Sequence, residues 1–199
     1  TCGSSETCGF DQTCIPMPLG QDVGLVRAFG LVARVAIEPL QPGNNYFFTE
    51  LAHPGTTTDA VVFLTAPGGF LGELGLYGIG VTPLAPVAEG WVVTEGQPLV
   101  VAWDVPPAGA RSRVLVEINI DQHGLTPATL TCDLPDVGEA EIPQGIVDGL
   151  VSAGVTGYPT GRVTRRTVDS AVRPAGCVDF TVTSVRAVTT RKAWRILYL

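Results

Sequence analysis

The side chains that could hold a metal ion or move protons gather in one stretch, from Glu117 to Asp136, which also contains Asp121, His123 and Asp133. Carboxylate oxygens are the ligands that calcium prefers, and imidazole nitrogen favours transition metals such as zinc. Asp121 and His123 fall on one side of an expected strand end. A calcium or zinc site would form there if Asp133 or Asp136 approached from the next strand.

The same stretch is also explained without a metal. It lacks the D-x-[DN]-x-[DN]-G order of calcium loops, and a polar strand face that ends in a glycine-containing turn accounts for the same letters. We therefore favour a strand, a turn and another strand, and we expect no cofactor. Calcium or zinc stays as the alternative.

Signatures of catalysis are scarce elsewhere. The chain has two histidines, His53 and His123, and contains neither a G-x-S-x-G elbow nor an H-E-x-x-H motif. A hydrolytic triad can assemble from distant positions, so a secreted hydrolase with a non-local active site is an alternative. Because no residue stands out as a nucleophile, we expect a protein that is not an enzyme.

Five cysteines favour a disulfide framework. Cys2, Cys8 and Cys14 form a C-x5-C-x5-C cluster, which lacks the C-x2-C spacing and the nearby histidine of a zinc site. Cys132 and Cys177 lie far along the chain in strand-like sequence, and we predict a bridge between them. One cysteine of the cluster is then left for an upstream residue or for another molecule.

The start of the sequence favours export. It begins at Thr1 without a signal peptide, so we expect that a targeting segment was removed and that the protein is extracellular or on the cell surface. A lipid anchor upstream of Thr1 is compatible with this expectation. The longest uncharged runs, 60–72 and 74–88, are too short or too rich in Gly and Pro for a transmembrane segment.

The charges predict the kind of partner. A net charge of −7 disfavours nucleic acid, whose phosphates are bound by Lys and Arg. Between residues 35 and 110 the chain contains acidic residues but no Lys or Arg. From Gly161 onward, arginine and lysine outnumber the acidic residues. Arg162 and Arg166 share one face of an expected strand, where they either hold an anionic protein partner or form a solvated edge.

Composition and alternation predict an all-β chain of 199 residues, because 45% of them are hydrophobic while 24 glycines and 16 prolines interrupt long helices. One short helix is expected between Pro143 and Gly154. The strands at 91–94 and 99–103 are a hairpin candidate, and the glycines of 71–80 are expected to permit either close strand packing or bulges. Further strands are expected at 31–38, 46–51, 60–65, 114–121, 128–134, 162–168 and 177–185.

The stretches GQPLVVAWDVP, VLVEINID, CDLPDVGEAEIP and GCVDFTVTSV resemble immunoglobulin-like domains of uncharacterised bacterial secreted proteins and lipoproteins, over residues 90–186. The strand pattern fits an all-β sandwich, and together with the resemblance it implies an immunoglobulin-like β-sandwich over 19–199, with extra N-terminal strands and a subdivision near 86–90 as an option. Residues 1–18 form a small disulfide-tied segment before it. Because Trp103 precedes both Cys132 and Cys177, no antibody-like binding loop is carried over.

We therefore expect an adhesion or binding module that acts through protein–protein contacts. The alternative is a self-assembling subunit of an extracellular fibre or surface layer that uses its C-terminal strand. Trp194, Ile196 and Tyr198 form one face of that strand, at 193–199. It either completes its own sheet or adds to the sheet of a neighbouring copy.

Overall fold

Strands make up about half of the described chain and helices only a small part of it, which confirms the all-β class. The computed structural model describes residues 2–9, 11–17, 19–87, 90–121, 126–154, 157–174 and 176–193. Within them the strands form two four-stranded and three two-stranded sheets. The assignment to an immunoglobulin-like sandwich stays a prediction.

A small hairpin opens the chain, within the segment that was predicted to be tied by a disulfide. It consists of β1 (Glu6–Cys8) and β2 (Cys14–Pro16), and a disulfide between Cys2 and Cys14 ties it. Cys8 lies directly across the hairpin from Cys14 and is a free thiol. Cys8 is therefore the cysteine of the cluster that is left over.

The N-terminal sheet has the order β4-β3-β5-β6 and is antiparallel throughout. Its strands are β3 (Val26–Phe29), β4 (Val35–Ile37), β5 (Val61–Ala66) and β6 (Leu74–Ile79), with a short 3-10 helix, η1 (Gly69–Leu71), between the last two. The predicted strand at 46–51 is absent. Tyr46 turns inward, where its hydroxyl accepts the Val23 N–H at 3.0 Å, while Phe47 and Phe48 are exposed.

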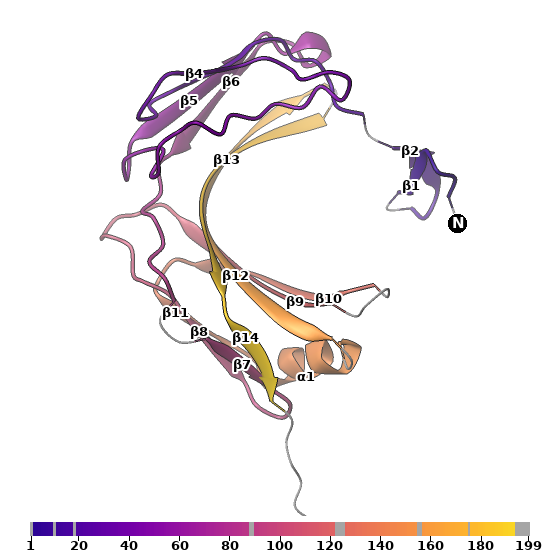
Figure 1. Cartoon of the computed structure of the whole chain (residues 1–199), viewed down its shortest axis with the longest axis vertical. Coiled ribbons are helices and arrows are strands. Elements are labelled where there is room, and N and C mark those ends of the chain that lie inside the picture. Colours follow the sequence, from indigo (N-terminus) through magenta and orange to yellow (C-terminus); the bar gives the residue numbers. More distant parts are fainter. Residues whose placement is uncertain are drawn as a thin grey trace, which may run out of the picture.

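The C-terminal part is a two-layered sandwich (Figure 1). One layer is the sheet β10-β9-β12-β13, and the other consists of the pairs β11-β8 and β14-β7. Buried residues from both layers form one core cluster. The strands are β7 (Trp91–Thr94), β8 (Leu99–Ala102), β9 (Arg113–Asp121), β10 (Ala128–Pro135), β11 (Glu139–Ile142), β12 (Tyr158–Arg173), β13 (Gly176–Val188) and β14 (Thr190–Ala193).

The predicted hairpin of β7 and β8 is wrong in its pairing, although both strands exist. β7 pairs in parallel with β14, and β8 pairs antiparallel with β11. Alternation along a strand determines which face is buried but does not identify the neighbouring strand.

The predicted helix is confirmed as α1 (Gln144–Ala153), with Pro143 and Gly154 at its two ends. Val147, Leu150 and Val151 are buried, whereas Ile146 is 50% exposed. Among the described residues, no helix has the length and apolar character needed to cross a membrane.

The long strands β12 and β13 connect the two parts of the molecule, since they run from the sandwich up to the N-terminal sheet (Figure 1). β12 pairs with β9 only as far as Arg166. Beyond that point its side chains cap the edge of β6: the Tyr77 N–H donates to Asp169 at 2.9 Å, and Thr167 donates to the Ile79 carbonyl at 2.7 Å.

β6 also packs closely on β13. A Cβ atom added at Gly78 would lie 2.7 Å from Val182 and 2.9 Å from Phe180. The prediction that the glycines of this stretch permit close packing is therefore confirmed at Gly78.

Candidate functional site

The outer face of the N-terminal sheet carries a mixed aromatic and charged surface. On β3, buried Val26 and Ala28 alternate with exposed Arg27 and Phe29. β6 alternates in the same way, as a strand with one buried face must, whereas on β5 buried Val62 and Ala66 flank three half-buried residues. The side chains that face away from the core therefore lie together on one side of the sheet.

Three aromatic rings form a row across this face. Strand register places Phe29 opposite Phe63 and Phe63 opposite Tyr77. The ring centroids of Phe29 and Phe63 are 6.4 Å apart, and those of Phe63 and Tyr77 are 4.4 Å apart, with the rings stacked in both pairs. Phe29 is 43% exposed and Tyr77 is 58% exposed. We call these three residues the aromatic row.

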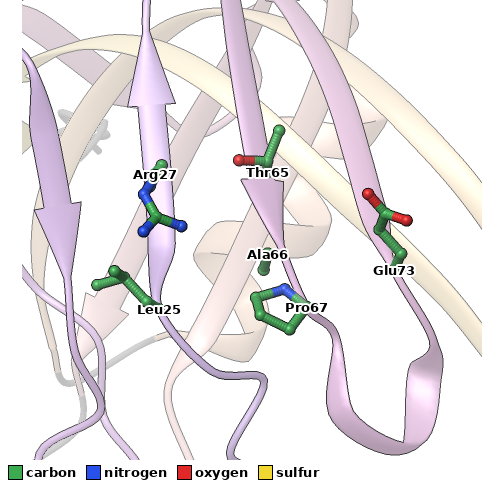
Figure 2. Close-up of a pocket in the computed structure, with 6 residues that line it drawn as sticks. All are labelled: Leu25, Arg27, Thr65, Ala66, Pro67 and Glu73. Carbon is green, nitrogen blue, oxygen red and sulfur yellow. The ribbon is translucent and has the colours of Figure 1, made fainter.

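A depression of about 320 Å³ lies beside the aromatic row, lined by Leu25, Arg27, Thr65, Ala66, Pro67 and Glu73 (Figure 2). Register places Gly75 of β6 opposite Thr65 of β5. Because Gly75 has no side chain, nothing projects from the sheet on the β6 side of Thr65. A Cβ atom there would meet only the Phe63 ring, at 3.5 Å.

Two opposite charges flank this depression. Arg27 on β3 and Glu73 just before β6 stand on either side of Thr65 (Figure 2). Two strand spacings separate β3 from β6, or roughly 10 Å. In the described part of the chain, neither the Arg27 guanidinium nor the Glu73 carboxylate has a hydrogen-bond or ion-pair partner. Both charges are thus available to a ligand.

A polar cluster around Arg165 is largely buried, and its charged groups pair with one another. Arg165 is 0% exposed and donates to Asp136 at 2.7 Å and to Asp104 at 3.2 Å. Asp136 also accepts hydrogen bonds from Ser112 at 2.6 Å and from the Trp103 indole at 2.8 Å. Because these groups satisfy one another, the cluster has no free group with which to bind or react.

The pKa of Asp136 reflects this environment. Burial raises the pKa of its carboxyl, but the hydrogen bonds from Arg165, Ser112 and Trp103 and the Arg165 charge outweigh burial and hold the pKa below its ordinary value. Asp136 is therefore a structural anion rather than a proton donor.

The acids of the 117–136 stretch do not converge. Asp133 lies on the polar face of β10, where Arg113 donates to it at 2.9 Å and Arg166 at 3.0 Å, while Asp136 turns into the core. Asp121 is exposed at the end of β9. His123 lies outside the described residues, among which no group of acids, histidines and cysteines is arranged to hold a metal ion.

The predicted interaction residues have varied outcomes. Arg162 makes a two-pronged ion pair with Glu117 at 2.8 and 2.9 Å, and Arg166 is paired with Asp133. Neither arginine is free for an anionic partner in this arrangement. Trp194, Ile196 and Tyr198 lie outside the described residues, so the interaction predicted for the C-terminal strand stays untested.

The predicted bridge between Cys132 and Cys177 is wrong, because both are free thiols. Cys132 is on β10 and Cys177 is on β13, the two opposite edge strands of one sheet. Three strand spacings come to roughly 14 Å, whereas a disulfide requires Cα atoms within about 7 Å. Burial raises the pKa of the Cys132 thiol.

Comparisons with known proteins add no assignment: no family model matches the chain, and no curated protein sequence matches it.

Proposed function

We propose that the protein is an exported, non-enzymatic adhesion or binding module that holds a protein partner on the outer face of its N-terminal sheet. The observation that carries this proposal is the exposed aromatic row beside the unpaired charges of Arg27 and Glu73. A few residues carry most of the binding free energy of a protein interface, and tyrosine and arginine are common among them.

The face defines the chemistry of the partner. An apolar side chain fits over the position of Gly75, where the sheet has no side chain of its own. A carboxylate of the partner then lies against Arg27, and a lysine or arginine against Glu73. Such opposite charges at the rim fix orientation, while burial of the rings supplies affinity.

Export is supported by the Cys2–Cys14 disulfide, since disulfides persist in oxidising compartments. The non-enzymatic part of the proposal is supported by the pairing of the charged groups within the sandwich. Asp133, Asp136 and Glu117 are each occupied by an arginine.

Binding of labelled protein to intact source cells tests the proposal. We expect saturable binding that is lost when the cells are treated with protease. The double variant Phe29→Ser, Tyr77→Ser is expected to bind roughly tenfold more weakly or worse. A matched control is Val172→Ser, since Val172 is 81% exposed but lies on β12, away from this face.

The outcomes separate clearly. Binding that survives protease treatment contradicts a protein partner. Equal binding by the double variant and the wild type assigns the partner to another surface and overturns the proposed site.

A further inference from the structure

β10 is an open sheet edge. It is 8 residues long and pairs only with β9 among the described strands. An unpaired edge presents a row of backbone N–H and C=O groups that can accept another strand. Proteins normally protect such edges from pairing with other chains: the edge strand is short, carries charged residues or proline, or is covered by another element.

The strands at the other edges of the N-terminal sheet and of the sandwich have more of this protection than β10, which carries one charge, ends at Pro135 and contacts α1. β4 has only 3 residues, and side chains of β12 cap β6. β7 and β8 contact each other. Charged side chains lie on β11 (Glu139, Glu141), β14 (Arg191, Lys192) and β13 (Asp179, Arg186).

The side chains of β10 leave its edge nearly uncharged. Asp133 is its single charged residue, and Arg113 of β9 and Arg166 of β12 hold that carboxylate over the sheet, away from the edge. The opposite face of the strand is apolar. Its side chains are only partly buried, although they pack on the core cluster: Ala128, Leu130, Cys132 and Leu134.

The sequence around β10 is symmetric in a way that suits self-pairing. Pro127 precedes the strand and Pro135 ends it, and Thr131 is the midpoint between them. Proline has no N–H to donate to a ladder, so the two prolines limit pairing to 128–134. When β10 pairs with its own copy about Thr131, Pro127 of each copy lies opposite Pro135 of the other. Both prolines are then just outside the paired residues.

We propose that β10 pairs antiparallel with β10 of a second copy, about a two-fold axis at Thr131, so that two sheets join into one. Directly opposed residues in such a pair face the same side of the sheet. Leu130 then meets Cys132 of the second copy on the apolar face. Asp133 meets Thr129 rather than its own copy, so like charges are not directly opposed.

This self-association is independent of the proposed partner site, because β10 and the aromatic row belong to different sheets. Sedimentation velocity over a concentration series tests it. The background carries Cys8→Ser and Cys177→Ser, because these exposed thiols could otherwise cross-link. We expect a reversible monomer–dimer equilibrium for this form.

Thr131→Lys is the diagnostic variant, since the exposed Thr131 side chain faces its own copy at the axis. Two opposed lysines are expected to weaken dimerisation roughly tenfold. Thr131→Glu is expected to do the same, and an equimolar mixture of the two variants to restore association. Thr181→Lys is the matched control, on the exposed side of β13 in the same sheet, and should dimerise normally.

A monomer at every concentration overturns the inference, as does a Thr131→Lys protein that dimerises like the control. If the mixture of Thr131→Lys and Thr131→Glu associates again, misfolding is excluded as the reason why each variant alone dimerises weakly. The double variant Phe29→Ser, Tyr77→Ser should dimerise fully. If it is monomeric, the second copy sits on the N-terminal sheet, which overturns the inference while keeping that sheet as a binding face.

Discussion

The Arg165 guanidinium contacts the Asp136 carboxylate at 2.7 Å with both side chains closed off from water, at 0% and 3% exposure. The same guanidinium donates to the Thr82 carbonyl at 3.1 Å and to the side chain of Asp104. Thr82 belongs to the connection between the N-terminal sheet and the sandwich. Arg165 therefore joins three segments to β12: the connection that contains Thr82, the segment after β8 and the turn after β10.

Replacing Arg165 by methionine should be severely destabilising, because it leaves the buried Asp136 carboxylate without its charge partner. We expect the free energy of unfolding to fall by about 3–5 kcal/mol, measured by urea denaturation. Arg113→Met is the control, since the Arg113–Asp133 pair is 53% and 43% exposed and should contribute less than about 1 kcal/mol. Equal losses in the two variants would contradict the role of Arg165.

Acid should weaken the fold through Asp136. Its pKa is lowered in the folded state from the ordinary value of 3.8, so the folded form holds its proton less tightly than the unfolded form. The stability this provides is complete above 3.8 and is lost as the pH falls through the lower, folded-state pKa. Unfolding midpoints measured in a pH series should therefore drop steeply on the acid side.

Asp136→Asn identifies the group responsible. The variant should be less stable at neutral pH, because the Arg165 charge loses its partner, and its stability should depend less on pH below 3.8. If the stability of this variant falls with decreasing pH as steeply as that of the wild type, other carboxylates cause the pH dependence.

Alternation along the sequence predicted the positions of β9 and β10, because the pattern of a half-buried strand is local. The same alternation could have flagged Arg165, which shares its side of β12 with the buried Val163. An arginine at such a position needs a buried acid. The sequence does not identify Asp136 as that acid, because the two lie 29 positions apart and meet only through strand order.

The aromatic row could not be predicted from the sequence for a related reason. Phe29, Phe63 and Tyr77 each alternate with buried neighbours on their own strands, but their alignment depends on the register of two strand pairs. Register is determined by tertiary packing rather than by any one strand. The error at Cys132 and Cys177 has the same source, since strand sequences do not reveal that β9 and β12 separate them.

Thiol labelling tests the cysteine assignment. Without reductant, the native protein should label quickly at the exposed Cys8 and Cys177 and slowly at Cys132, where burial raises the pKa of the thiol and keeps the thiolate scarce. Non-reducing peptide mapping should recover Cys2 joined to Cys14. Recovery of a peptide joining Cys132 to Cys177 would contradict the order of strands in the β10-β9-β12-β13 sheet.

The contact between β6 and β13 gives the last prediction. Gly78→Ala adds a methyl group that would lie 2.7 Å from the Val182 side chain and 2.9 Å from the Phe180 ring, so these side chains or the strands that carry them must shift. Overpacking of this kind should lower the free energy of unfolding by about 1–3 kcal/mol in urea denaturation. Gly75→Ala on the same strand is the control, because its methyl group meets only the Phe63 ring at an ordinary contact distance of 3.5 Å. If both substitutions leave stability unchanged, β6 does not rest on β13. If only Gly78→Ala lowers the free energy of unfolding, the result supports close packing of β6 on β13, the contact by which β12 and β13 support the N-terminal sheet.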